Sequence, residues 1–112
     1  HIASCYRQGL SGIGDLVLPH FEGDAFVDIF QNYVIRTRRR DALRAYLRER
    51  GVETLVHWPK PVWEHKGLQL GDHHLPETEN ICREVISLPM SAETSEQEVD
   101  YVVTCIRDFF RP

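Results

Sequence analysis

Residues 27–51 have the sequence VDIFQNYVIRTRRRDALRAYLRERG, in which a strand pattern passes directly into a helix pattern. The first part, 27–37, is rich in β-branched and aromatic residues and predicts a strand. The second part carries an i, i+3, i+4 apolar stripe, which predicts an amphipathic helix; the stripe consists of Leu43, Tyr46 and Leu47. Asp41 suits the first turn of that helix, and Gly51 suits the left-handed position after its last turn.

The segments on either side continue the mixture of strands and helices. Upstream, residues 1–10 follow a helical period that is cut off at its start, and 16–18 predict a short strand that ends at Pro19. Downstream, apolar and polar residues alternate over 52–58, which predicts a second strand. A loop of about 18 residues follows, and loops of that length are often functional.

The C-terminal third predicts two helices separated by a short strand. A helix is expected from Pro76 to Val85, and 86–88 predict a strand. The last helix begins at two overlapping capping boxes, Thr94 with Gln97 and Ser95 with Glu98. Its apolar residues recur at helical spacing: Val99, Val102, Val103, Ile106 and Phe110. The whole pattern predicts an α+β fold with a small, mostly antiparallel sheet covered by helices.

Composition limits the possible classes of protein. The 112 residues fit one compact domain, and 42% apolar with 27% charged residues is an ordinary globular balance. A net charge of −4 argues against a general nucleic-acid binder, and no apolar run is long enough for a membrane span. The chain begins at His1 and its single methionine is Met90, so we expect a fragment or a processed product.

Cysteine and histidine spacing supports neither a disulfide framework nor a metal site. Cys5, Cys82 and Cys105 are widely spaced, which predicts reduced, mostly buried thiols in a cytoplasmic protein. The adjacent His73 and His74 beside Asp72 predict a solvated turn, because neighbouring side chains diverge.

The arginines around the predicted helix have two possible explanations. Seven arginines occur between residues 36 and 50, while the rest of the chain is acidic. They are Arg36, Arg38, Arg39, Arg40, Arg44, Arg48 and Arg50. A solvated helix face is the first explanation, and a docking surface for an acidic partner or a phosphate is the second.

The most informative stretch for function is VHWPKPVWEH at 56–65. A predicted strand ends at His57, two prolines stiffen the exit, and Trp58 and Trp63 are the only two tryptophans of the chain. Large aromatic residues are typical of cores and interfaces rather than of plain loops. Two interpretations remain open: a rigid arm that presents these side chains at a cleft, or an edge loop whose tryptophans cap the core.

Three segments, in this order and spacing, resemble the C-terminal portion of the DegT/StrS-type sugar aminotransferases. They are the strand and helix ending at Gly51, the turn GVETLVHWPKP at 51–61, and the ending VISLPMSAETSEQEVDYVVTCIRDFF at 85–110. These enzymes have fold type I and use pyridoxal phosphate. The resemblance implies amino transfer, usually from glutamate, to a keto sugar carried on a nucleotide.

The resemblance also implies a division of labour. The family's cofactor is held by a lysine in a large N-terminal domain, the small C-terminal domain closes over the cleft, and the enzymes are typically homodimers. Residues 1–12 would be the end of the helix between the domains, and 13–112 would be the small domain. His57 matches the family's motif histidine, so a substrate-binding role is implied for it and its loop neighbours Trp58, Trp63 and His65. Trp63 departs from the family's second histidine.

The lysines of this chain limit what the resemblance implies. Lys60 and Lys66 are the only two, and neither matches the Schiff-base lysine of the family. A Schiff base needs a deprotonated amine held against the cofactor. We therefore expect no catalytic residue in this chain, no cofactor bound by it alone and no transamination without a larger domain. The alternative is a stand-alone interaction module with the same small-domain fold.

Overall fold

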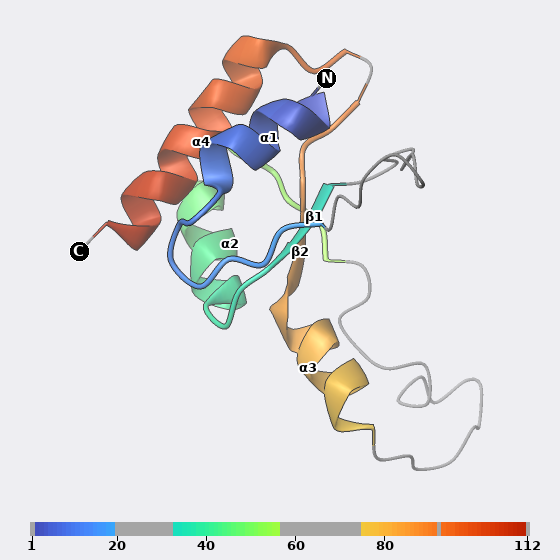
Figure 1. The fold of residues 1–112 in the computed structure, drawn as a ribbon. Coiled ribbons are helices and arrows are strands. Elements are labelled where there is room, and N and C mark those ends of the chain that lie inside the picture. Colours follow the sequence, from blue (N-terminus) through green and yellow to red (C-terminus); the bar gives the residue numbers. More distant parts are fainter. Residues whose placement is uncertain (1, 20–32, 57–74, 92, 112) are drawn as a thin grey trace, which may run out of the picture.

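The computed structural model describes residues 2–19, 33–56, 75–91 and 93–111, which form four helices and a two-stranded antiparallel sheet (Figure 1). The elements are α1 (Ile2–Leu10), β1 (Tyr33–Arg36), α2 (Arg40–Glu49), α3 (Pro76–Glu84), β2 (Val85–Leu88) and α4 (Glu96–Phe110). The predicted α+β class is confirmed, as are the helices expected from the apolar periodicity. The part of the predicted first strand that is described, from residue 33 onward, is β1.

The sheet is narrower than the sequence predicts. Within the described residues, the expected strands at 16–18 and 52–58 are each reduced to one isolated bridge, Val17 with Arg36 and Leu55 with Ser87. The prediction of two further strands was therefore wrong for the described part of these segments. Val17 and Leu55 are 54% and 57% exposed, so neither segment has the packing that extends an edge strand.

The register of the two strands gives the sheet two different faces. Tyr33 lies opposite Leu88, and Ile35 lies opposite Ile86. Because side chains alternate along a strand, these four residues share one face, and all four are buried. We call this the covered face, since α1, α2 and α4 supply the other residues of the hydrophobic core and lie on its side of the sheet (Figure 1).

The opposite side is called the open face. By the same alternation it carries Val17, Val34, Arg36, Leu55, Val85 and Ser87. Val17 and Leu55 are exposed and Val34 is half-buried, whereas Val85 and Ser87 on β2 are buried. Helix α3 projects away from the body of the molecule, and of its residues Cys82 alone is buried (Figure 1).

Helix α1 is an integral part of the core. The Tyr6 ring stacks on Tyr33 with 5.0 Å between centroids, and the Tyr6 hydroxyl donates to the Pro89 carbonyl at 2.5 Å. Burial raises the pKa of Tyr33 to about 12, so this phenol stays neutral. Gly9 lets α1 approach α4 closely, because a Cβ built there would lie 2.6 Å from Val103 Cγ1.

Only one of the two predicted capping boxes forms at the start of α4. Ser95 Oγ accepts from the Glu98 N–H at 3.1 Å, and the Ser95 N–H donates to the Glu98 carboxylate at 3.3 Å. Thr94 serves the preceding turn instead, where its hydroxyl accepts from the Ser91 N–H at 2.9 Å. The prediction for Thr94 was wrong because this hydroxyl can satisfy either the turn or the helix, and the turn holds it.

The arginines of α2 are not all on a solvated face. Arg40 is 8% exposed, and its Nη1 donates to the carbonyls of Cys82 at 3.0 Å and Val85 at 2.9 Å. It thereby joins the start of α2 to the junction of α3 and β2, where helix carbonyls lack intrahelical partners. The prediction of a uniformly solvated arginine face was wrong at this residue.

Two further predictions concern the cysteines and the termination of α2. Cys82 and Cys105 are buried, Cys5 is half-buried, and all three are free thiols, as expected. Gly51 has a φ of 78°, which confirms the left-handed turn after α2. In the described ranges no helix combines the length and the apolarity that crossing a membrane requires.

Candidate functional site

The predicted substrate-binding residues, His57, Trp58, Trp63 and His65, lie outside the described residues. Their proposed roles therefore remain predictions. The two lysines and the Asp72, His73, His74 turn also lie outside them. The structure does show how the chain approaches this segment and what surface surrounds that approach.

The approach is anchored at the edge of β2, two residues before His57. The Leu55 N–H donates to the Ser87 carbonyl at 3.2 Å, and the Ser87 N–H donates to the Leu55 carbonyl at 2.7 Å. Upstream, the Val52 N–H donates to the Leu47 carbonyl at 2.9 Å and so ties the segment to the end of α2. Residues 52–55 are thus held at both ends, and a rigid scaffold of this kind can position a functional loop.

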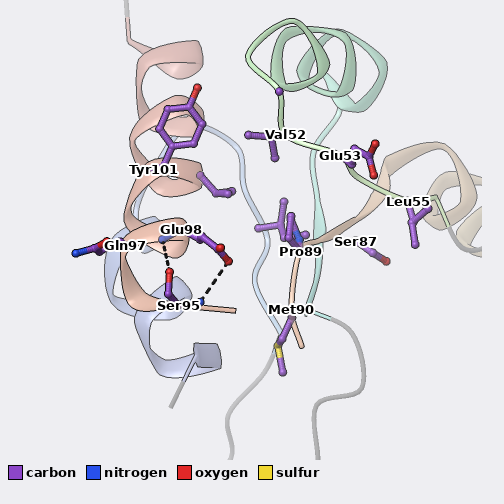
Figure 2. A pocket seen from close by; sticks show the side chains of 13 residues that line it. Val52, Glu53, Leu55, Ser87, Pro89, Met90, Ser95, Gln97, Glu98 and Tyr101 are labelled. Carbon is purple, nitrogen blue, oxygen red and sulfur yellow. Dashed lines mark hydrogen bonds between the residues drawn. The ribbon is translucent and has the colours of Figure 1, made fainter. Parts of the chain in front are cut away.

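A groove of about 860 Å³ lies between this anchored segment, the end of β2 and the first half of α4 (Figure 2). We call it the α4 groove. Its lining residues are Gly51, Val52, Glu53, Leu55, Ser87, Leu88, Pro89, Met90, Ser95, Gln97, Glu98, Tyr101 and Val102. The volume is within the range of small-molecule sites.

The polar groups at the rim of the α4 groove are largely engaged by the fold. Ser95 and Glu98 satisfy each other in the capping box, and the Tyr101 hydroxyl donates to the Arg50 carbonyl at 2.7 Å. Among the described residues, the lining holds no histidine, cysteine or lysine, and its ionisable and hydroxyl side chains are Glu53, Ser87, Ser95, Glu98 and Tyr101.

Sequence reasoning did not anticipate the α4 groove. Its walls come from the segment after α2 and from the end of β2 with the start of α4, more than 30 residues further along the chain. The positive φ of Gly51 and the break at Pro89 are the only local signals, since they turn the chain away from the sheet on both sides of the groove.

A metal centre finds no support in the described part of the chain. No group of three or more histidine, cysteine, aspartate or glutamate side chains that could hold an ion occurs among the residues the structure describes. Some carboxylates of the described residues accept hydrogen bonds at the ends of helices instead. Asp15, for example, accepts from the Thr37 hydroxyl at 2.5 Å and from the Arg38 N–H at 2.8 Å, just before α2.

Comparison with known proteins decides the family. The sequence profile described as the DegT/DnrJ/EryC1/StrS aminotransferase family matches residues 1–107. The chain belongs to this family. A relative from Geobacillus stearothermophilus, named pleiotropic regulatory protein, is 38% identical over 99% of this chain and 31% of the relative. The dTDP-3-amino-3,4,6-trideoxy-alpha-D-glucose transaminase of Streptomyces venezuelae is 32% identical over 96% of this chain and 29% of that enzyme.

Solved structures of the DegT/DnrJ/EryC1/StrS family have the same fold. The crystal structure of S. venezuelae DesV in complex with a ketimine intermediate superposes with a TM-score of 0.91 at 30% identity. The match covers 99% of this chain and 30% of DesV. A family aminotransferase from Brucella abortus has a TM-score of 0.86 at 24% identity, which supports the fold alone. The chain thus spans about 30% of the length of the relatives it matches.

Sugar aminotransferases of this family use pyridoxal phosphate, and the described residues do not fit that cofactor by themselves. The cofactor needs a lysine amine for attachment. The described ranges 2–19, 33–56, 75–91 and 93–111 contain no lysine. The hydroxyl of Tyr6, a phenol in the core, is already committed to the Pro89 carbonyl. A lysine that attaches the cofactor would therefore lie outside these described ranges.

Proposed function

We propose that this chain is the small C-terminal domain of a pyridoxal-phosphate-dependent nucleotide-sugar aminotransferase. In this proposal residues 1–12 end a linker helix, 13–112 form the small domain, and a larger domain supplies the reactive lysine. The observation that carries it is the superposition of almost the whole chain on 30% of a sugar aminotransferase captured with a ketimine intermediate. The family match over residues 1–107 supports the same conclusion.

The unequal faces of the sheet support an interface with a larger domain. The open face exposes Val17 and Leu55, Ile81 on α3 is 40% exposed, and Leu75, which precedes α3, is 53% exposed. Exposed large apolar side chains of this kind can form a surface that contacts another part of a protein. We propose that the open face and α3 pack against the larger domain and that the covered face only stabilises the small domain.

The substrate in this proposal is a keto sugar carried on a nucleotide, and the amino donor is glutamate. The cofactor provides the electron sink for amino transfer once it is bound to the larger domain. The role of this chain is to bind and orient the sugar nucleotide through His57, Trp58, Trp63 and His65. The anchor between Leu55 and Ser87 fixes where that segment begins. Assembly as a cytoplasmic homodimer is part of the same proposal.

A spectroscopic experiment tests the proposal. The 112-residue chain mixed with pyridoxal phosphate is expected to give no lysine-dependent aldimine absorbance band and no borohydride-stable adduct. The polypeptide encoded by the complete gene is expected to give both, and to transaminate a nucleotide-linked keto sugar with glutamate. A stoichiometric adduct at Lys60 or Lys66 of the isolated chain would contradict the proposal.

The substrate-binding residues have a separate test. In the complete polypeptide, His57→Ala is expected to raise the KM for the nucleotide sugar about tenfold or more, since losing a polar contact to substrate costs about 1.4 kcal/mol or more. Cofactor absorbance should remain unchanged. His73→Ala is the matched control and should leave the KM unchanged. Equal effects of the two substitutions would remove the argument for His57.

One relative favours a second candidate function. The protein from Geobacillus stearothermophilus at 38% identity is named pleiotropic regulatory protein rather than transaminase. We propose as the alternative a protein-interaction module with the same fold. A complete polypeptide that binds no pyridoxal phosphate but forms a specific complex with another protein, seen by gel filtration, would favour this alternative.

A further inference from the structure

Arg44 and Arg48 lie one turn apart on α2, and both are exposed. Two other arginines of the run form ion pairs, Arg36 with Glu84 at 2.8 Å and Arg40 with Asp41 at 2.6 Å. Arg39 and Arg50 lie over aromatic rings instead. Within the described residues neither Arg44 nor Arg48 has a carboxylate in ion-pair range. Like charges one turn apart repel each other. The helix dipole compensates for Arg48 in the last turn, but Arg44 lies too far from that end.

The two arginines line a groove of about 510 Å³, whose opposite wall is the segment from Gly51 to Leu55. We call it the arginine groove. Thr54 contributes a half-buried hydroxyl, and Glu53 contributes an exposed carboxylate. The wall is held by the hydrogen bonds of Val52 and Leu55 described above, so its position does not depend on a ligand.

We propose that the arginine groove binds a phosphoryl anion, either free phosphate or the phosphate of a small ester. Two guanidinium forks one turn apart can each donate two hydrogen bonds to the same group, which is the geometry that phosphate accepts best. The volume of the groove suits a small ligand. An acidic protein would also have to cover the outer surface of α2, where the exposed Asp41 and Glu49 would repel it.

Glu53 allows a test of whether the anion binds within the arginine groove. Its carboxylate lines the same groove, so it opposes an anion bound between the arginines. Removing that charge without changing the shape, as in Glu53→Gln, should therefore tighten phosphate binding. A surface that attracts anions only through overall charge would respond equally to the loss of any exposed carboxylate, such as that of Glu93.

The experiment titrates the full chain with inorganic phosphate, pyrophosphate and dTDP at constant ionic strength, with isothermal calorimetry as the measurement and circular dichroism as the folding control. The double variant R44Q/R48Q is expected to weaken phosphate binding about tenfold or more. R44K/R48K keeps the charge but loses the forks, so an intermediate loss of about threefold is expected. The matched control R83Q/R107Q removes two other exposed arginines and should change affinity less than about twofold.

Two results would overturn the proposal. One is an equal loss of affinity in R83Q/R107Q and R44Q/R48Q, which would show attraction by overall charge alone. The other is the lack of measurable binding of any of the three anions to the unaltered chain. Tighter binding of dTDP than of inorganic phosphate, lost in R44Q/R48Q, would identify a nucleotide as the source of the phosphoryl group. Equal affinities would identify free phosphate.

Discussion

The covered face and the open face belong to the same two strands, yet they have opposite surroundings. On the covered face, Tyr33, Ile35 and Ile86 are fully buried beneath α1, α2 and α4. On the open face, Val17 and Leu55 are more than half exposed although each forms a bridge to a strand. Pairing at the edge of the sheet therefore does not bury Val17 or Leu55, whereas Val85 and Ser87 of β2 are buried on the same face. The hydrophobic core itself lies on the side that α1, α2 and α4 cover.

This difference separates stability from function in the molecule. The covered face buries enough apolar surface to hold the fold, since each fully buried aliphatic side chain contributes about 1.5–3 kcal/mol. The open face and α3 keep apolar surface available for another domain. Substitutions on the two sides should therefore have unequal effects on the free energy of unfolding.

The largest difference is expected between two isoleucines on different helices. Ile106 on α4 is fully buried, whereas Ile81 on α3 is 40% exposed. Ile106→Ala should destabilise the chain by about 2–5 kcal/mol, because it removes buried methyl groups and leaves a cavity. The same substitution at Ile81 should cost less than about 1 kcal/mol. Urea unfolding followed by circular dichroism measures both, and similar costs would refute the division between the faces.

The next effect concerns Arg40, which connects α2 to the less well packed α3. Arg40→Met keeps the aliphatic length but leaves the carbonyls of Cys82 and Val85 without this donor. The expected cost is about 2–3 kcal/mol. Arg44→Met on the exposed side of the same helix is the control and should stay within about 0.5 kcal/mol. A small effect at Arg40 would mean that water replaces the guanidinium and that α3 is held by other contacts.

Gly9 tests how tightly α1 and α4 are packed on the covered side. A Cβ at Gly9 would lie 2.6 Å from Val103 Cγ1, so Gly9→Ala forces the helices apart. The intrinsic helix preference of alanine recovers part of the cost, and we expect a net loss of about 1–2 kcal/mol. The double variant Gly9→Ala/Val103→Ala should lose less stability than the sum of the two single losses, since the second substitution makes room for the first. Strictly additive losses in thermal unfolding would contradict the close approach.

Much of this fold could be predicted from the sequence, because its helices have strong local signals. The stripe of Leu43 and Leu47, the proline that opens α3 and the capping box of Ser95 each depend on nearby residues. The strands expected at 16–18 and 52–58 were wrong for the described residues, which form only single bridges there. Alternation shows that a segment could lie in a sheet, but pairing depends on a distant partner that the local sequence does not contain.

The candidate site was less predictable than the fold. The histidine and tryptophan motif after Val56 has a local signal in the sequence, and its role stays a prediction. The α4 groove and the arginine groove could not be located from local signals such as Gly51, because each forms where the segment after Gly51 passes another element. The burial of Arg40 was missed for the same reason, since its two carbonyl partners lie more than 40 residues away in sequence.

The smallest expected effect concerns Asp15, which supports the start of α2. Burial acts to raise the pKa of Asp15, but the hydrogen bonds from the Thr37 hydroxyl and the Arg38 N–H outweigh it and lower the pKa below its ordinary value of 3.8. The ionised form is therefore stabilised in the folded chain. This contribution is complete above the unfolded pKa and is lost as the pH falls through the folded pKa.

Asp15→Asn should consequently lower stability by about 0.5–1 kcal/mol at pH 7, as for the loss of a helix-capping group. The difference from the unaltered chain should shrink as the pH is lowered from 5 towards 3, because the carboxyl of the unaltered chain then becomes protonated as well. Thermal unfolding at several pH values measures this difference. Asp100→Asn, on the exposed surface of α4, is the control substitution. If the stability difference between Asp15→Asn and the unaltered chain stays constant down to pH 3, the charge of Asp15 does not stabilise the start of α2. The start of α2 would then depend on packing and hydrogen-bond geometry, as the covered face does.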